Sequence, residues 1–183
     1  MKKILLIIVL TLCIFQMVVL ATAIDIGSAA ITRINSGPTT STYIFKTNPA
    51  NETGKITSIE IYASATMLNV EVATFYNVSG TNFSTRDTHS IGTVTAGAKR
   101  TFTVNMDVHE GDYLGFHMTA GRFYWNATGG LGYWFYSGTD KIPCTNETFT
   151  LGSGTTYIYS VYGTGVTAEV GAEENAIFFG MAF

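Results

Sequence analysis

The sequence has 183 residues, of which 46% are hydrophobic and 13% charged, and its formal net charge is −3 at pH 7. Binding to nucleic acid or to an anionic membrane surface needs a concentration of basic side chains, and ten basic residues against thirteen acidic ones argue against both. The length is that of a single domain.

Residues 1–23 have the parts of a secretory signal peptide. Lys2 and Lys3 form a positive start, a long apolar run follows, and "ATA" ending at Ala23 has the small-x-small form that signal peptidase cleaves. Without this segment, eight basic residues remain against thirteen acidic ones, a formal charge of −5. We therefore expect a secreted or extracellular surface protein, which contacts a membrane only through the N-terminal segment if that segment is not cleaved.

From residue 24 to residue 163 the sequence predicts one β-domain. Turns containing Gly, Asn, Asp and Ser separate short runs rich in Thr, Val, Ile and aromatic residues, which is typical of an all-β sandwich or barrel. Residues 31–54 are irregular and predict one or two strands with long connections, because proline limits pairing in a sheet centre.

Alternating side chains locate the next strands and their inner faces. Strand 55–63 has Thr57, Ile59 and Ile61 on one face, and strand 68–76 has Leu68, Val70, Val72 and Thr74 on one face. The alternation is cleanest in strand 99–108, where the inward set is Phe102, Val104 and Met106.

The residues "HEGD" predict a turn between strand 99–108 and the returning strand 113–118. Calcium binds carboxylates in turns of this kind, which makes Asp107, Glu110 and Asp112 weak calcium candidates. Because their spacing lacks the ligand set of an EF-hand loop, we predict no metal site.

The stretch "RFYWNATGGLGYWFYSGT", which begins at Arg122, is dense in aromatic residues. It predicts two strands joined by a hairpin at "NATGG", with these residues facing the core: Phe123, Trp125, Tyr133 and Phe135. The outward face then carries Tyr124, Trp134 and Tyr136. There they would stack on sugar rings, contact a neighbouring subunit or be covered by a loop.

Residues 164–183 predict a polar linker followed by an apolar strand, in which one face carries Ile177, Phe179, Met181 and Phe183. Such a strand must be buried, so it either completes the domain's own sheet or pairs with a neighbouring molecule by strand donation. Outside the signal segment the sequence has one cysteine, Cys144, which we expect to be a buried hydrophobic residue.

Five Asn-x-Ser/Thr triplets without a central proline predict N-glycosylation acceptors at Asn51, Asn77, Asn82, Asn126 and Asn146. An occupied acceptor must face solvent, so these triplets also predict exposed positions.

Several motifs together resemble a widespread β-sandwich module of extracellular, surface and virion-associated proteins of environmental microbes and their viruses. These motifs are "ATFY", "FSTRDT", "IGTVTAG", "TFTVNMDV", "GDYLG" and "IPCTNETFT". The resemblance covers residues 25–163 and implies a jelly-roll-like sandwich in an extracellular setting. It implies no activity and no ligand, so it assigns no functional residues.

No catalytic pattern is recognisable, since the three histidines belong to no motif and no "GxSxG" elbow occurs. We therefore expect a non-enzymatic protein without a cofactor, folded as a two-sheet antiparallel β-sandwich. The first hypothesis is a structural or adhesive surface or fibre subunit, which associates with itself or with other surface proteins through strand edges and aromatic patches. The alternative is a carbohydrate-binding module that uses the outward aromatic residues.

Overall fold

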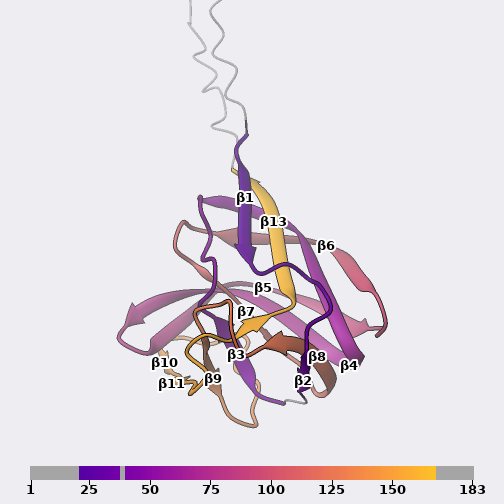
Figure 1. Ribbon diagram of the computed structural model, residues 1–183. Coiled ribbons are helices and arrows are strands. Elements are labelled where there is room, and N and C mark those ends of the chain that lie inside the picture. Colours follow the sequence, from indigo (N-terminus) through magenta and orange to yellow (C-terminus); the bar gives the residue numbers. More distant parts are fainter. Residues whose placement is uncertain (1–20, 38–39, 168–183) are drawn as a thin grey trace, which may run out of the picture. The chain divides into compact units, whose positions relative to one another are not determined.

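The computed structural model describes residues 21–37 and 40–167 (Figure 1). This part of the chain consists of β-strands joined by turns and loops, so the all-β prediction is confirmed, and it contains no helix that could cross a membrane. The signal segment up to residue 20 and the apolar residues Ile177, Phe179, Met181 and Phe183 lie outside the described residues.

The described strands are all paired antiparallel. They are β1 (Ala23–Gly27), β2 (Asn35–Gly37), β3 (Thr42–Phe45), β4 (Gly54–Ser79), β5 (Asn82–Val94), β6 (Lys99–Val108), β7 (Tyr113–His117), β8 (Ala120–Asn126), β9 (Tyr133–Tyr136), β10 (Glu147–Thr148), β11 (Thr150–Leu151), β12 (Ile158–Tyr159) and β13 (Val161–Thr167).

Strand β4 organises the sheet because it pairs with five other strands along its 26 residues. Its first part pairs with β6 and β13, its middle with β8, and its last part with β5 and β7. The sheet continues from β13 to β1 on one side, and from β7 through β3 and β9 to β11 on the other. Strands β2 and β12 pair with β8, and β10 pairs with β5.

Two irregularities in β4 change which side chains point inward. Opposite β13, Thr57 is an extra residue, so Ile56 and Ile59 are both buried and Thr57 is exposed, which corrects the prediction for this strand. Further along, Asn69 has a left-handed φ of 49° where the pairing with β5 shifts, and Leu68 is 43% exposed. A bulge inserts one residue without a partner and rotates its neighbours.

Buried side chains form two clusters on opposite faces of the sheet. Neighbouring residues of β4 contribute to each, since Val72 belongs to the larger cluster and Ala73 and Phe75 to the smaller one. The predicted alternation of β6 is confirmed, because Val104 and Met106 are buried while the residues between them are exposed.

The ends of the described domain meet where β1 pairs with β13. The Thr167 amide donates to the Thr22 carbonyl at 3.0 Å, and the Thr22 amide donates to Thr167 Oγ1 at 2.9 Å. Because β13 runs to Thr167, the linker predicted from residue 164 does not begin there. Figure 1 places β1 and β13 at one end of the domain and β2, β3 and β9 at the other.

Candidate functional site

The two aromatic strands β8 and β9 do not form the predicted hairpin. Strand β8 pairs with β2, β4 and β12, whereas β9 pairs with β3 and β11. The backbone that joins them is bonded elsewhere, since the Gly130 and Gly132 amides donate to the carbonyls of Thr156 and Tyr157. The strands are therefore separated, and their apolar faces border a common pocket at the edge of the larger hydrophobic cluster.

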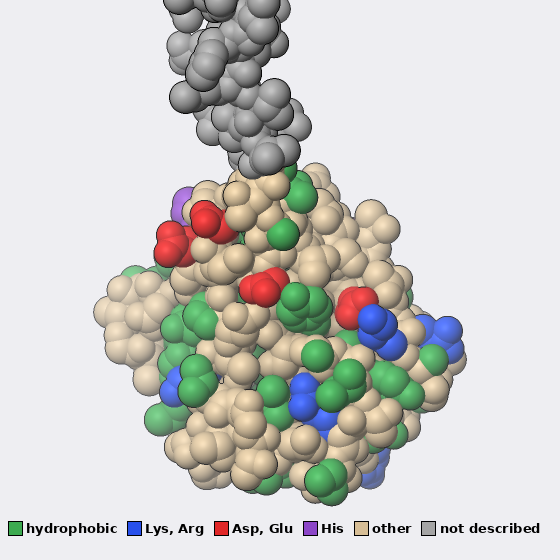
Figure 2. Space-filling view, turned by 45° about the horizontal axis from the view of Figure 1, so that its top comes forward, with side chains coloured by type: hydrophobic (Ala, Val, Ile, Leu, Met, Phe, Trp, Pro, Cys, Tyr) green, Lys and Arg blue, Asp and Glu red, His purple; other side chains and the backbone are tan. Residues whose placement is uncertain are grey.

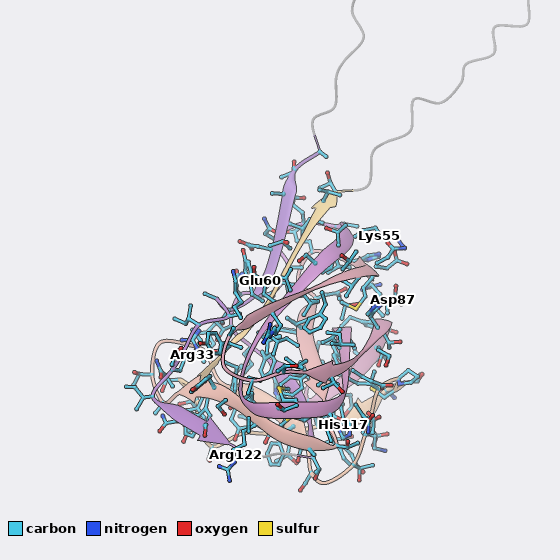
Figure 3. All side chains as sticks on the ribbon, turned by 90° about the vertical axis from the view of Figure 1, so that its right-hand side faces the viewer. Arg33, Lys55, Glu60, Asp87, His117 and Arg122 are labelled. Carbon is cyan, nitrogen blue, oxygen red and sulfur yellow. The ribbon has the colours of Figure 1, made fainter. Side chains whose placement is uncertain are left out.

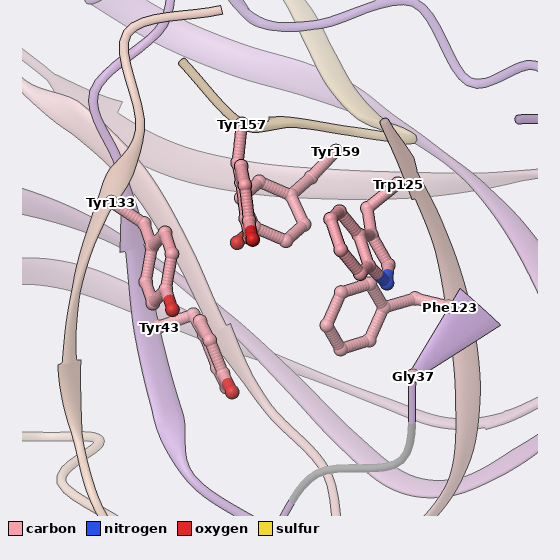
Figure 4. A pocket seen from close by; sticks show the side chains of 7 residues that line it. All are labelled: Gly37, Tyr43, Phe123, Trp125, Tyr133, Tyr157 and Tyr159. Carbon is pink, nitrogen blue, oxygen red and sulfur yellow. The ribbon is translucent and has the colours of Figure 1, made fainter. Parts of the chain in front are cut away.

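The pocket has a volume of about 140 Å³ and is lined by Gly37, Tyr43, Phe123, Trp125, Tyr133, Tyr157 and Tyr159 (Figure 4). Phe123 and Tyr159 are buried, whereas Tyr43, Trp125, Tyr133 and Tyr157 are half-buried. The lining comes from β2, β3, β8, β9 and β12, so the pocket lies at the end of the domain away from Thr22 and Thr167 (Figure 1).

The aromatic rings hold one another in place around the pocket. Trp125 stacks on Tyr157 with ring centroids 4.4 Å apart, and Tyr157 stacks on Tyr133 at 6.0 Å. Tyr43 continues the series at 5.3 Å from Tyr133 and meets Phe123 edge-on at 5.7 Å. Offset and edge-on contacts of this kind are the favourable arrangements of aromatic pairs, so the pocket wall is preorganised.

Glycines bring the backbone against the outer sides of these rings. A Cβ on Gly152 would overlap the ring of Tyr133, and a Cβ on Gly154 would overlap the ring of Tyr157. A Cβ on Gly37 would lie 3.3 Å from Trp125 Nε1. Only glycine leaves room for the rings at positions 152 and 154, so these two glycines fix where the walls formed by Tyr133 and Tyr157 stand.

Two tyrosine hydroxyls of the pocket, those of Tyr133 and Tyr159, have a raised pKa. Burial, and secondly the neighbouring Tyr43 and Tyr157, raises the pKa of Tyr133. Burial raises the pKa of Tyr159 far above its ordinary value near 10. A neutral phenol both donates and accepts hydrogen bonds, so the pocket combines apolar ring faces with polar hydroxyl edges.

Replacing Tyr159 with phenylalanine should reduce the loss of stability in alkali. The folded state holds the Tyr159 proton more tightly than the unfolded state does. The protonated hydroxyl therefore makes its full contribution to the free energy of unfolding below pH 10, and this contribution is lost as the pH rises above 10. At pH 11 the cost is about 1.4 kcal/mol. Urea unfolding at pH 8 and pH 11 should therefore give a smaller difference for Tyr159→Phe than for the parent protein.

The control for this measurement is Thr101→Val, which removes an exposed hydroxyl that does not titrate. Its free energy of unfolding should change with pH as that of the parent protein does. The same pH-dependent loss in Tyr159→Phe and in the parent protein would contradict the prediction.

Trp134 and Tyr136 lie on the other face of β9, but that face is covered. The Trp134 ring packs 4.7 Å from Phe83, and the Tyr136 ring packs 6.0 Å from Phe149. Together with Ile142 these residues belong to the smaller hydrophobic cluster, which the segment after β9 folds over. Of the three alternatives for Trp134 and Tyr136, the packing agrees with cover by the chain's own loop, which leaves both residues half-buried.

The predicted glycosylation acceptors differ in how their amides are used. Asn51, Asn77 and Asn146 are exposed, and Asn82 and Asn126 are half-buried. The amide nitrogens of Asn51, Asn77 and Asn82 donate hydrogen bonds, whereas those of Asn126 and Asn146 donate none within the described residues. Glycosylation stays a prediction, and Asn126 and Asn146 are the acceptors whose modification breaks no such bond.

The weak calcium candidates are engaged with basic side chains instead. Asp112 is buried and accepts hydrogen bonds from Arg86, and Asp107 forms an ion pair with Lys55 at 2.6 Å. Glu110 is exposed in the turn. In residues 21–37 and 40–167, no three His, Cys, Asp or Glu side chains come together as a metal site.

Cys144 is half-buried against the smaller hydrophobic cluster. Its amide donates to Thr85 Oγ1 at 2.8 Å, and burial raises the pKa of its thiol. The thiol therefore stays protonated, which makes it a poor nucleophile.

The pocket lining provides aromatic faces, phenol hydroxyls and an indole N–H, which suit a ligand with both apolar and hydroxyl surfaces. The sequence predicted Phe123, Trp125 and Tyr133 as inward residues, but it did not associate them with Tyr43, Tyr157 or Tyr159. No protein-family model matches the chain, and a search of curated proteins finds no significant match.

Proposed function

We propose that the protein is a non-enzymatic extracellular binding domain that holds one neutral sugar ring of a glycan in the aromatic pocket. The observation that carries this proposal is the ring of Tyr43, Phe123, Trp125, Tyr133 and Tyr157 around a pocket without charged side chains. A sugar ring has an apolar face and a rim of hydroxyls, and an aromatic wall with polar edges matches both.

The size of the pocket supports a single ring. A cavity of about 150 Å³ holds one benzene molecule, and the pocket has about 140 Å³. A second ring would have to lie outside, so we expect recognition of one residue, with the rest of the glycan extending into solvent.

The polar groups support a ligand rich in hydroxyls. Trp125 Nε1 has no hydrogen-bond partner among the described residues, and the pKa of Tyr133 is raised, so its hydroxyl remains a donor at neutral pH. A purely apolar ligand would leave the indole N–H without a partner, which costs free energy when that group is buried. A sugar hydroxyl supplies both a donor and an acceptor.

The test is binding of the folded protein to immobilised neutral glycans. We expect retention on at least one neutral polysaccharide, and competition by the free monosaccharide of that polymer. If the protein bound no neutral glycan on an array that covers the common hexoses, pentoses and N-acetylated sugars, the proposal would be wrong.

The finer description of the fold belongs to the same proposal. We infer a jelly-roll-like, two-sheet sandwich around the larger hydrophobic cluster, related to the extracellular module that the sequence motifs resemble, and secretion through residues 1–23. The long shared strand β4 and the separated strands β8 and β9 support two layers.

The fibre-subunit hypothesis rests on residues outside the described part of the chain. Strand donation by residues 176–183 stays a prediction, while Trp134 and Tyr136, covered by the chain's own loop, no longer support an assembly patch. Deleting residues 176–183 and measuring particle size by light scattering tests this hypothesis separately.

A further inference from the structure

The outer face of β4 and β8, opposite the pocket side of β8, carries a second aromatic group. The rings of Tyr62 and Tyr124 meet edge to face with centroids 5.4 Å apart. Neighbouring side chains of a strand point to opposite faces, so Arg122 lies on the same face as Tyr124, while Phe123 and Trp125 face the pocket.

Arg33 reaches this face from the segment between β1 and β2. Its Nε donates to Ser160 Oγ at 2.9 Å, and its Nη2 donates to the Ala29 carbonyl at 3.0 Å. Ser160 lies between the two tyrosines, because its carbonyl accepts from the Tyr62 amide and its amide donates to the Tyr124 carbonyl. The guanidinium is thus fixed next to the tyrosine pair.

Arg33 and Arg122 have no carboxylate partner among the described residues, whereas nearby Lys99 is paired with Glu60 at 2.7 Å. Figure 3 shows Arg33, Glu60 and Arg122 along one side of the domain. A guanidinium has five N–H donors, so three of those on Arg33 have no partner in this part of the chain. Burial lowers the pKa of Arg33, and an anion beside it would offset the cost of that burial.

We propose that this face binds an acidic polysaccharide, with one carboxylate or sulfate on Arg33, another on Arg122 and a sugar ring against Tyr124. The planar guanidinium matches a carboxylate or sulfate with paired hydrogen bonds. In the view of Figure 2, charged side chains stand singly or in small groups among uncharged ones, and two unpaired arginines are too few for nucleic acid, which needs many phosphate contacts.

The test measures binding to two acidic polymers, polygalacturonate and dextran sulfate, with unsubstituted dextran as the neutral reference. At 0.15 M salt we expect the parent protein to bind one of the acidic polymers, and the preferred polymer identifies carboxylate or sulfate. Arg122→Gln should weaken this binding about tenfold, the effect of one charge-assisted hydrogen-bonded contact. Arg33→Lys, which keeps the charge but loses the planar fork, should also weaken it.

The matched control is Arg100→Gln, which makes the same change in net charge. Arg100 is exposed and pairs with Ile61, whose side chain is buried on the other face of β4. Its removal should leave the binding unchanged. The proposal is overturned if the parent protein binds neither acidic polymer, or if Arg100→Gln weakens binding as much as Arg122→Gln does.

Discussion

Replacing Trp125 with alanine should lower the affinity for a neutral glycan by at least about 30-fold, which corresponds to about 2 kcal/mol. Trp125 is the largest ring of the pocket, and its contact with Tyr157 at 4.4 Å forms one wall. Removing the indole takes away both the stacking surface and the Nε1 donor, and it frees Tyr157 to move. Isothermal titration with the glycan identified by the array would measure the loss.

The control is the neighbouring residue on the same strand. Tyr124 lies on the opposite face of β8, against Tyr62, so Tyr124→Ala should leave neutral-glycan affinity unchanged. A Trp125→Phe variant keeps a ring without the N–H and should lose less affinity than Trp125→Ala. Equal losses in Trp125→Ala and Tyr124→Ala would show that the pocket is not the binding site.

Replacing Arg86 with methionine should destabilise the domain by about 3 kcal/mol, because it leaves a buried carboxylate without its partner. Asp112 is only 2% exposed, and Arg86 Nη2 donates to its Oδ1 at 3.0 Å while Nε donates to Oδ2. Asp112 Oδ2 also accepts from the His109 amide at 2.8 Å, so the ion pair ties β5 to the β6–β7 turn. The Arg86 side chain is 22% exposed, which places the effect at the low end of the range for buried pairs.

Urea unfolding at neutral pH measures this loss, and Lys55→Met provides the control. Lys55 pairs with Asp107, but both side chains are exposed. Solvent screens such a pair, so its removal should change the free energy of unfolding by less than about 1 kcal/mol. If the two variants were equally stable, the Arg86 to Asp112 pair would have no special role in stability.

Local alternation in the sequence predicted strand faces correctly where a strand keeps its own alternation. In β6, Val104 and Met106 are buried as expected, although the pairing with β4 shifts between Met106 and Thr103. In β4 the same rule failed at Thr57 and Leu68. A bulge depends on the partner strands, and it changes which of the following side chains point to the inner face.

The pocket was only half predictable. Alternation identified Phe123, Trp125 and Tyr133 as inward-facing, but whether an inner face is filled depends on which strands lie opposite each other, and that is set by contacts distant in sequence. The "LGSGTTY" segment carries a signal that could have been used, because its glycines at 152 and 154 make room for the rings of Tyr133 and Tyr157.

The pairing of β1 with β13 has a mechanical consequence. Because Thr22 and Thr167 are neighbours at one end of an antiparallel pair, a force that pulls these two residues apart acts along the interstrand hydrogen bonds. It would load the bonds one after another, so the pair would peel open at low tension. A force applied between the pocket and one terminus would not pull β1 and β13 apart in this way. The domain is therefore unsuited to hold load between Thr22 and Thr167, whereas a ligand held in the pocket, as proposed, would pass load through one end alone.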